Sequence, residues 1–495
     1  MLYKSTRGGD AAGAAGAIAQ GIAADGGLFA PETLPAVTQG EIESFAAKGY
    51  VHAAECILRK YLTDYADAQL KSAVHSAYGQ GAFPCGPAVL REITEETAVL
   101  ELWHGPTFAF KDVALQLLPR LLVLAAGKSA GQKEIVILAA TSGDTGKAAL
   151  EGFAGVPGTK IVVFYPQDGV SVVQERQMVT QRGDNVFVLA VKGNFDDAQA
   201  GVKRMFSDRQ LTGQMAAKGL FFSSANSINW GRLAPQIVYY FYAYALAVKN
   251  GRVKAGEKID FAVPTGNFGN ILAGFYALGM GLPIGRLICA SNANNVLADF
   301  INTGRYDRRR TFHKTISPSM DILASSNLER LLYHLTGQDA PAVSGWMKLL
   351  AQEGAYDIGA ENKKALQKYF SGYWADDGAT QKTIAETFAA HKYLMDPHTA
   401  VAWKACADHR RQTGGAGYAI VLSTASPFKF ALPVLKALDP GAPDMGAFAA
   451  IAALSGLSGL KIPEAMRELD RLPVLHGKAV AAEQMTGAVR EILAI

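Results

Sequence analysis

The chain has 495 residues, of which 49% are hydrophobic and 19% are charged, and basic side chains exceed acidic ones by only four charges. This length predicts two or three domains, each with its own core. The weak charge imbalance indicates neither a nucleic-acid nor an acidic membrane partner, and no run of eighteen apolar residues predicts a membrane-spanning helix.

The four cysteines, Cys56, Cys85, Cys289 and Cys406, lie far apart and include no C-x-x-C pair. Such spacing indicates neither a metal site nor a disulfide framework, so we expect no bound metal and a reducing compartment, the cytoplasm. The Ala/Gly-rich stretch 10–24 lacks a basic region followed by an apolar core. We therefore expect it to be part of the fold and not a signal peptide.

Residues 1–97 are predicted to form a mainly helical N-terminal domain, because apolar residues recur at helical spacing in 50–61 and 64–78. Glycines and prolines in 81–87 then break the pattern. Beyond this break, apolar runs of strand length alternate with helical stretches. The expected strands are 134–140, 160–165, 186–191, 259–263, 286–290 and 418–422, and the expected helices are 147–153, 196–207, 271–278 and 295–301.

This alternation predicts an α/β fold with doubly wound, mostly parallel sheets, whose ligands bind at the carboxyl ends of the strands. We expect 98–305 and 395–495 to form the core, with a smaller α/β subdomain embedded at about 130–190. The polar and helical stretch 306–394 is expected to be a helical insertion or cap.

A lysine stands behind aromatic residues in the motif His104-Gly-Pro-Thr-Phe-Ala-Phe-Lys111-Asp112. An amine attacks a carbonyl only when it is unprotonated, and partial burial beside Phe108 and Phe110 would lower the pKa of Lys111. Lys111 is therefore a candidate for a Schiff base with pyridoxal phosphate, although most lysines are simply exposed. We expect His104 to orient the loop and not to carry protons.

The segment Pro264-Thr265-Gly266-Asn267-Phe268-Gly269-Asn270 follows one expected strand and opens the next helix. Glycines let the backbone fold around an anion, and the free N–H groups at a helix start favour a phosphate. The segment fits neither G-x-x-x-x-G-K-[ST] nor G-x-G-x-x-G, so it does not favour a nucleotide. A capped Gly-rich turn is the alternative.

Two hydroxyl-rich loops follow other expected strands. Thr141-Ser142-Gly143-Asp144-Thr145-Gly146 would suit a substrate carboxylate, or would simply cap its helix. Asp144 itself would repel an anion, so we expect it to cap the helix or to bond to N–H groups. Ser423-Thr424-Ala425-Ser426 ends the last expected strand, where a neutral hydroxyl could bond a pyridine nitrogen.

Together these motifs resemble the longer, bacterial type of the threonine synthase family, pyridoxal-phosphate enzymes of fold type II, similar to the tryptophan synthase β subunit. The resemblance runs nearly end to end, through Tyr3–Gly8, Asp25–Pro31, the Lys111 motif, both glycine loops, Ser224–Arg232 and Ser423–Phe430. Two positions depart from the family pattern, because Ser426 and Phe428 stand where the family often has His and Ala. Asp144 stands where many fold type II enzymes have an asparagine, whose cofactor contact we do not transfer.

The resemblance implies that Lys111 holds pyridoxal 5'-phosphate. It implies a phosphate cradle of Thr265, Gly266, Asn267, Phe268, Gly269 and Asn270. Thr424 is the expected partner of the pyridine nitrogen, with Ser423 as the alternative, and Ser142 and Thr145 match positions near the substrate carboxylate. Candidates for the substrate phosphate are Asn226, Asn229, Arg232 and Lys429, with Lys429 slightly favoured, although each could instead be structural.

The implied activity is that of a carbon–oxygen lyase, which converts O-phospho-L-homoserine and water to L-threonine and phosphate. The alternatives are another fold type II lyase, such as a phospholyase or a serine/threonine dehydratase, and a homologue that binds the cofactor without turnover. We expect a monomer or homodimer with a small-molecule substrate and no nucleic-acid or membrane partner.

Overall fold

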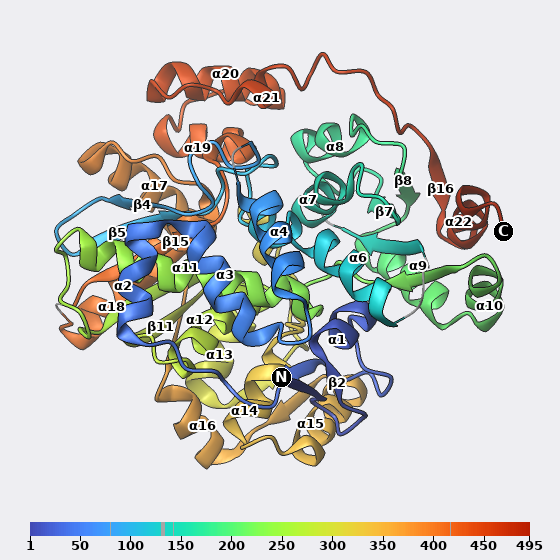
Figure 1. The fold of residues 1–495 in the computed structure, drawn as a ribbon. Coiled ribbons are helices and arrows are strands. Elements are labelled where there is room, and N and C mark those ends of the chain that lie inside the picture. Colours follow the sequence, from blue (N-terminus) through green and yellow to red (C-terminus); the bar gives the residue numbers. More distant parts are fainter. Residues whose placement is uncertain (80, 130–133, 142, 416) are drawn as a thin grey trace.

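The computed structural model of the protein describes residues 1–79, 81–129, 134–141, 143–415 and 417–495. Within them, two sheets of mostly parallel strands are flanked by helices, so the predicted α/β fold is confirmed (Figure 1). Among the helices described, none is both long and apolar enough to span a lipid bilayer.

The larger sheet has the strand order β14-β11-β10-β15-β5-β4, in which every neighbouring pair is parallel except β5 with β4. Its central strands are buried on both faces, as expected for a covered parallel sheet. In β10, Phe261 packs with the helices on one face and Ala262 packs with Val401 on the other. The strands are β4 (Val89–Glu92), β5 (Thr97–Glu101), β10 (Ile259–Pro264), β11 (Ile284–Ser291), β14 (Phe370–Trp374) and β15 (Ala419–Ser423).

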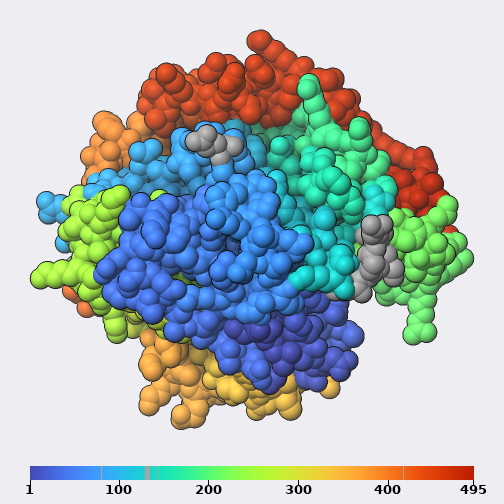
Figure 2. Space-filling view, viewed as in Figure 1, coloured from blue at the N-terminus to red at the C-terminus, as the bar shows by residue number. Residues whose placement is uncertain are grey.

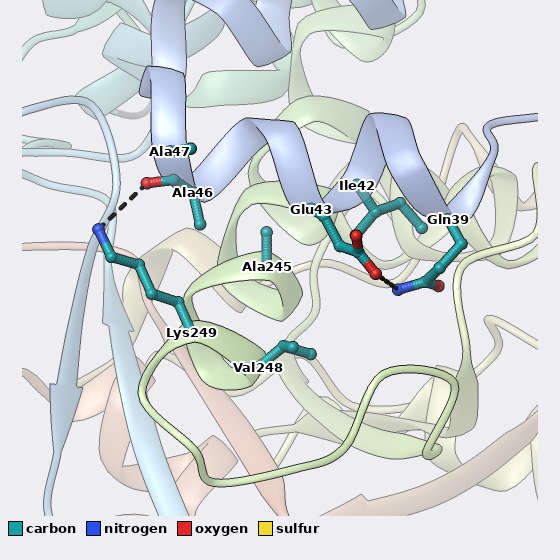
Figure 3. Close-up of a pocket in the computed structure, with 8 residues that line it drawn as sticks. All are labelled: Gln39, Ile42, Glu43, Ala46, Ala47, Ala245, Val248 and Lys249. Carbon is teal, nitrogen blue, oxygen red and sulfur yellow. Dashed lines mark hydrogen bonds between the residues drawn. The ribbon is translucent and has the colours of Figure 1, made fainter.

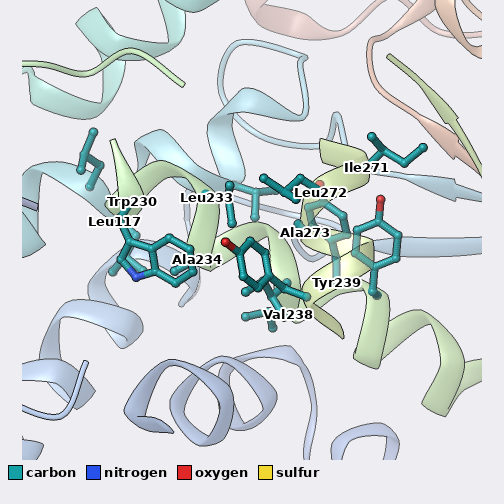
Figure 4. Packing of buried hydrophobic residues seen from close by; sticks show 14 of the residues in the cluster. Leu117, Trp230, Leu233, Ala234, Val238, Tyr239, Ile271, Leu272 and Ala273 are labelled. Carbon is teal, nitrogen blue, oxygen red and sulfur yellow. The ribbon is translucent and has the colours of Figure 1, made fainter. Parts of the chain in front are cut away.

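Helices α11 (Trp230–Lys249) and α12 (Gly269–Gly279) pack against each other beside this sheet, whereas α18 (Pro397–Thr413) covers the opposite face. Figure 4 shows Trp230 and Leu233 of α11 in the same core as Leu272 of α12, and all three are fully buried. This packing fixes the start of α12, where the Gly-rich segment 264–270 lies.

The smaller sheet is entirely parallel, with the order β16-β8-β7-β6-β9. Side chains of β6 and β7 alternate between two cores: Ile137 and Val163 pack with Ala149 of α7, whereas Leu138 and Val162 lie in the second core. The elements are β6 (Glu134–Ala140), α7 (Asp144–Phe153), β7 (Thr159–Pro166), α8 (Val172–Val179), β8 (Val186–Lys192), α9 (Phe195–Ser207), α10 (Arg209–Ala217), β9 (Leu220–Ser223), β16 (Ala479–Ala481) and α22 (Met485–Leu493).

The N-terminal region is mainly helical, as predicted, and also contains a small sheet of order β2-β1-β3. Figure 2 shows its residues, in blue, covering the middle of one face of the molecule. The elements are β1 (Leu2–Ser5), β2 (Ala12–Gly13), α1 (Ala14–Gln20), β3 (Phe29–Pro31), α2 (Gln39–Lys48), α3 (Tyr50–Tyr61) and α4 (Asp67–Tyr78), followed after β5 by α5 (Lys111–Leu115) and α6 (Leu118–Ser129).

The stretch 306–394 is more than the helical insertion expected, because β14 within it pairs with β11 at the edge of the larger sheet. It also holds β13, which pairs with β12 in a two-stranded antiparallel sheet. The elements from α13 onward are α13 (Val296–Thr303), β12 (Arg305–Asp307), η1 (Pro318–Met320), α14 (Leu328–Leu335), α15 (Ala340–Gln352), β13 (Ala355–Asp357), α16 (Gly359–Gln367) and α17 (Asp377–His391).

After β15 the chain forms η2 (Pro427–Phe430), α19 (Ala431–Leu438), α20 (Ala447–Ser458) and α21 (Glu464–Arg467). It then crosses the molecule as an extended segment to reach β16, which pairs with β8 (Figure 1). The C-terminus therefore completes the smaller sheet, beyond the range 130–190 expected for it. The division into domains stays a prediction.

Candidate active site

The Lys111 loop is joined to the loop that follows β15. Phe110 N–H donates to the Thr424 carbonyl at 2.9 Å, and Ser426 N–H donates to the Phe108 carbonyl at 3.1 Å. Ala109 and Ala425 form an isolated β-bridge between these bonds. Two motifs far apart in the sequence therefore lie side by side at the carboxyl end of the larger sheet.

A buried carboxylate lies between two lysines at this edge. Asp144 Oδ1 is 2.6 Å from Lys429 Nζ, and its Oδ2 is 3.7 Å from Lys111 Nζ. Lys429 also donates to the Thr107 carbonyl at 3.0 Å, and its side chain is fully buried. Gln174 Nε2 donates to Asp144 Oδ1 at 2.9 Å. Asp144, which we expected to cap its helix or to bond N–H groups, accepts from the Gln174 amide but is chiefly the centre of this ion-pair cluster, and the N-cap of α7 is Gly143.

Burial lowers the pKa of Lys111 from 10.5 to about 8, because the charged ammonium loses water. Asp144 opposes the shift by attraction, whereas Lys429 and Arg232 add to it by repulsion. For Asp144 itself burial would raise the pKa, but Lys429 and Lys111 hold it far below its ordinary value. The neutral amine that a Schiff-base lysine needs is thus accessible near neutral pH.

The Gly-rich segment forms a cup of unsatisfied donors. Among the described residues, no acceptor is found for the five consecutive backbone N–H groups of Gly266, Asn267, Phe268, Gly269 and Asn270. Phe268 adopts a left-handed conformation with φ of 64°, which is unusual for an aromatic residue and turns the backbone into the helix start.

Other contacts hold the cup in shape. The Asn270 carbonyl and its side-chain oxygen accept from Tyr240 at 2.9 and 3.2 Å, while the buried Asn270 Nδ2 has no partner among the described residues. Thr265 Oγ1 donates to the Val263 carbonyl at 2.7 Å. A Cβ on Gly266 would lie 2.8 Å from the Ser319 carbonyl, so only glycine fits there. Such a rigid nest of N–H groups at a helix start fits a phosphate.

In the loop 141–146, one of the hydroxyl groups bonds the backbone of the loop itself. Thr141 Oγ1 accepts from Gly143 N–H at 3.0 Å and from Gly146 N–H at 2.9 Å, which closes the turn before α7. Thr145 is half-buried in the first turn of α7, beside Asp144. Ser142 lies outside the described residues.

At the end of β15 the two hydroxyl candidates differ. Ser423 Oγ accepts from Trp103 Nε1 at 2.9 Å and lies 3.0 Å from Thr399 Oγ1. Because the Thr399 proton goes to the Asp396 carboxylate, the Ser423 hydroxyl donates to Thr399, and its proton is already engaged. The Thr424 carbonyl is bonded to the Lys111 loop, whereas its side chain, 7% exposed, has no hydrogen bond among the described residues. This arrangement favours Thr424 over Ser423 as the partner of a ring nitrogen.

Arg232 is a buried cation without a carboxylate partner among the described residues. One guanidinium nitrogen donates to the Ala225 carbonyl at 2.9 Å, and Nε has no partner. Burial lowers the pKa of Arg232 to about 10. Because Arg232 also lowers the pKa of Lys111 by charge repulsion, it belongs to the same electropositive site. It is therefore prepared for an anion.

The two asparagines of this segment have different environments. Asn229 Nδ2 donates to the Ile18 and Ser224 carbonyls, both at 2.9 Å, and its Oδ1 accepts from Gly231 N–H at 2.8 Å. These bonds favour the structural alternative for Asn229. Asn226 is half-buried, and no side-chain hydrogen bond is found for it among the described residues.

His104 Nε2 lies 2.8 Å from Glu101 Oε2, and the ring stacks on Trp103. This contact agrees with the expected orienting role. Asp112, which sequence reasoning passed over, accepts from the N–H and the hydroxyl of Thr107 at 2.9 and 2.6 Å. Burial raises its pKa to about 6. Because Asp112 directly follows Lys111 in the sequence, its position in the motif could have identified it as a candidate site residue.

A cavity of about 280 Å³ lies elsewhere, between α2 and α11 (Figure 3). Its lining combines apolar side chains with Gln39, Glu43 and Lys249 and contains none of the predicted site residues. The lining residues are Gln39, Ile42, Glu43, Ala46, Ala47, Ala245, Val248 and Lys249.

Comparison with known proteins gives three family matches: threonine synthase N terminus at residues 2–78, pyridoxal-phosphate dependent enzyme at 95–369, and threonine synthase C-terminal at 399–473. The threonine synthase of Pseudomonas aeruginosa is 41% identical over 479 residues, which cover 96% of this chain and 99% of that protein. The human threonine synthase-like 1 protein is 40% identical, and the alignment spans 57% of its length.

The crystal structure of a pyridoxal-phosphate-bound threonine synthase from Brucella melitensis superposes with a TM-score of 0.87, at 36% identity and 99% coverage of both chains. The long, nearly complete alignments and the match to all three family models agree with the site geometry. The chain belongs to the threonine synthase family of pyridoxal-phosphate-dependent enzymes.

Proposed function

We propose that the protein converts O-phospho-L-homoserine and water to L-threonine and phosphate, with pyridoxal phosphate attached to Lys111. One observation carries this proposal beyond family membership. A buried lysine with a lowered pKa lies in a site that also holds Lys429 and Arg232, next to a cup of five N–H groups that have no acceptor in the described part of the chain. Such a site accepts one phosphate in the cup and further anionic groups of a substrate beside it.

The residues at the site suggest a role for each part. Residues 265–270 would hold the cofactor phosphate, and Thr424 would contact the ring nitrogen. Thr145, together with Ser142, would bind the substrate carboxylate at the start of α7. Asn226 stays a candidate substrate ligand because its side-chain amide has no hydrogen-bond partner among the described residues, although its backbone N–H donates to Ser224 Oγ. Asn229 is the weakest of the proposed ligands, since its amide already bonds the backbone.

Pyridoxal phosphate, when bound, supplies an electron sink, which lets protons leave the α and β carbons of the substrate before phosphate leaves the γ carbon. Lys111, whose amine would be free once the substrate occupied the cofactor, would be available as the base for these protons and could return one later. Asp144 stabilises the ammonium that forms when Lys111 takes a proton, because its carboxylate lies 3.7 Å away. Lys429 connects Asp144 to the Lys111 loop, because its ammonium pairs with the Asp144 carboxylate and donates to the Thr107 carbonyl.

The pKa of Lys111 predicts a pH dependence for cofactor capture by the cofactor-free protein. Since only the neutral amine attacks, and its pKa is lowered to about 8, capture is expected to accelerate about tenfold per pH unit below that value and to level off above it. Stopped-flow absorbance with free pyridoxal phosphate measures the rate. An ordinary lysine would instead give acceleration that continues above pH 9.

Arg232 is the best-supported ligand for the substrate phosphate. Sequence reasoning slightly favoured Lys429, but the Lys429 ammonium is already paired with Asp144 and bonded to Thr107, whereas the guanidinium of Arg232 has donors to spare. Lys429 would then act on the substrate only at longer range. A bidentate guanidinium also matches phosphate geometry better than an ammonium does.

Replacing Arg232 by methionine is therefore expected to lower kcat/KM for O-phospho-L-homoserine about 100-fold, mainly through KM. The lysine–cofactor absorbance should stay, because Arg232 has no proposed role in the cup. Steady-state kinetics and inhibition by inorganic phosphate measure the effect, and Arg176→Met, which removes a cation bonded only to carbonyls, serves as a control. Unchanged phosphate inhibition in Arg232→Met would rule the assignment out.

A product assay separates this function from its alternatives. Threonine and phosphate released in equal amounts support the proposal, whereas 2-oxobutyrate would indicate a phospholyase or a dehydratase. Retention of the cofactor without turnover would indicate a binding homologue. No observation of the site favours one of these alternatives.

We also propose that the protein acts on small molecules as a monomer or homodimer, without nucleic acid or a membrane surface as partner. Its near-neutral charge balance supports this view. The four cysteines are all free, which suits a reducing compartment such as the cytoplasm.

A further inference from the structure

A short turn of the 306–394 stretch, residues 317–321, reaches the proposed site. Ser319 Oγ donates to Asp144 Oδ2 at 3.4 Å, and this is the carboxylate oxygen that lies nearest to Lys111. The Ser319 carbonyl lies against Gly266 so closely that a Cβ there would be 2.8 Å away. The turn therefore touches both the ion-pair cluster and the phosphate cup.

The tip of this turn is held by a buried histidine. Ser319 N–H donates to His398 Nε2 at 3.0 Å, and His398 Nδ1 lies 2.7 Å from Asp396 Oδ1. The His398 side chain is 2% exposed and that of Asp396 is fully buried. Because a backbone N–H can only donate, Nε2 must be the acceptor, and the ring proton lies on Nδ1 and points at Asp396.

Asp396 is itself fixed on both sides. As the N-cap of α18 it accepts from His398 N–H at 2.9 Å, and it also accepts from the Thr399 hydroxyl. Thr399 Oγ1 lies 3.0 Å from Ser423 Oγ, next to the proposed pyridine ligand Thr424. A chain of hydrogen bonds therefore connects the turn, through His398, Asp396 and Thr399, to the end of β15.

The ends of the turn have other supports. Asn292 Nδ2 donates to the Ser317 hydroxyl at 3.1 Å and to Asp321 Oδ1 at 2.8 Å. Among the described residues, the backbone N–H of Ser319 has no acceptor except His398. Loss of that acceptor would free the tip while leaving both ends of the turn in place.

Resting on the proposed function, we propose that the turn 317–321 is a further wall of the active site, and that His398, oriented by Asp396, is a positioning residue that holds Ser319 against Asp144 and the phosphate cup. Neither residue contacts the cofactor in this account. Orientation of a contacting group by a buried histidine–carboxylate pair follows the general logic of outer contacts that fix inner ones.

Two substitutions of His398 distinguish a role in positioning the turn from a role in stabilising α18 alone. In His398→Gln, the side-chain oxygen lies near the place of Nε2 and can still accept from Ser319. In His398→Asn, the amide lies near the place of Nδ1, so it can donate to Asp396 but leaves Ser319 without an acceptor. A buried N–H without an acceptor costs about 1–3 kcal/mol, which corresponds to about 5- to 150-fold in an equilibrium constant.

The equilibrium dissociation constant of pyridoxal phosphate, measured from the absorbance of the lysine-bound cofactor, is therefore expected to rise about tenfold or more in His398→Asn and less than about threefold in His398→Gln. Thermal unfolding of the cofactor-free variants provides the control for folding. If the asparagine variant binds as tightly as the wild type, or more tightly than the glutamine variant, the positioning role is wrong.

A second test uses the milder change Ser319→Ala, which removes only the half-exposed hydroxyl. It should lower kcat about fivefold in the wild-type background and have no effect in His398→Asn, because the hydroxyl is no longer held there. Equal effects in both backgrounds would overturn the inference. If the wild type made no threonine, the proposed function would fail, while the comparison of cofactor binding would still decide the role of His398.

Discussion

Replacing Lys111 by alanine is expected to lower kcat for threonine formation at least about 1000-fold, because one side chain supplies both the covalent attachment and the proton transfers. The absorbance of the lysine-bound cofactor near roughly 410 nm should vanish in the same variant. Activity and spectrum are measured on protein reconstituted with excess pyridoxal phosphate, so that weaker binding alone does not explain a loss.

The matched control for this experiment is Lys147→Met. Lys147 is also a buried lysine near the start of α7, but it is paired with Glu151 at 2.7 Å, and no ion pair between it and Asp144 is found in the described part of the chain. Its replacement should leave the absorbance band in place and change kcat by less than about tenfold. A Lys111→Ala protein that retained most of its turnover would show that another amine performs the chemistry.

The second large effect is expected for Lys429→Met, which leaves the Asp144 carboxylate buried with Lys111 as its remaining lysine partner. Breaking a buried ion pair on one side costs about 3–5 kcal/mol of folding stability. Because Lys429 helps to lower the pKa of Lys111, its loss should also raise that pKa and slow cofactor capture at neutral pH. Urea unfolding and the stopped-flow capture rate measure the two effects.

The double variant Lys429→Met with Asp144→Asn tests the same ion pair from both sides. Removal of both charges leaves only Lys111 without a carboxylate, and its buried amine can become neutral because its pKa is already lowered, so stability should recover relative to Lys429→Met alone. Lys404→Met breaks the more exposed pair with Asp408 and should cost less than about 1 kcal/mol. If the losses of Lys429→Met and Asp144→Asn simply added, the two groups would not interact as the distance suggests.

Much of the fold could be predicted because its elements have strong periodic patterns. Helix α3 has the predicted bounds, Tyr50–Tyr61, because its apolar residues recur at helical spacing and are buried. β14 was missed, since it is short, contains Gly372 and ends in Trp374, which is 48% exposed at the sheet edge. The pairing of β16 with β8 depends on a chain crossing that no local pattern encodes.

The site was only partly predictable for the same reason. The Lys111 motif and the segment 264–270 are contiguous in the sequence, so each could be recognised as a candidate binding site from its local sequence alone. The contacts of Asp144 with Lys429 and of Ser319 with His398 join residues far apart in the sequence, and only the tertiary structure brings them together. Sequence reasoning made Lys429 a candidate ligand of the substrate phosphate, whereas its partner in the fold is a buried carboxylate.

The most direct test of the account is the location of the covalent bond. Reduction of the purified protein with borohydride, followed by proteolysis and mass spectrometry, should place a phosphopyridoxyl group on the peptide that contains Lys111 and on no other lysine peptide. A modified peptide from elsewhere in the chain, or an unmodified Lys111 in protein that is saturated with cofactor, would contradict it.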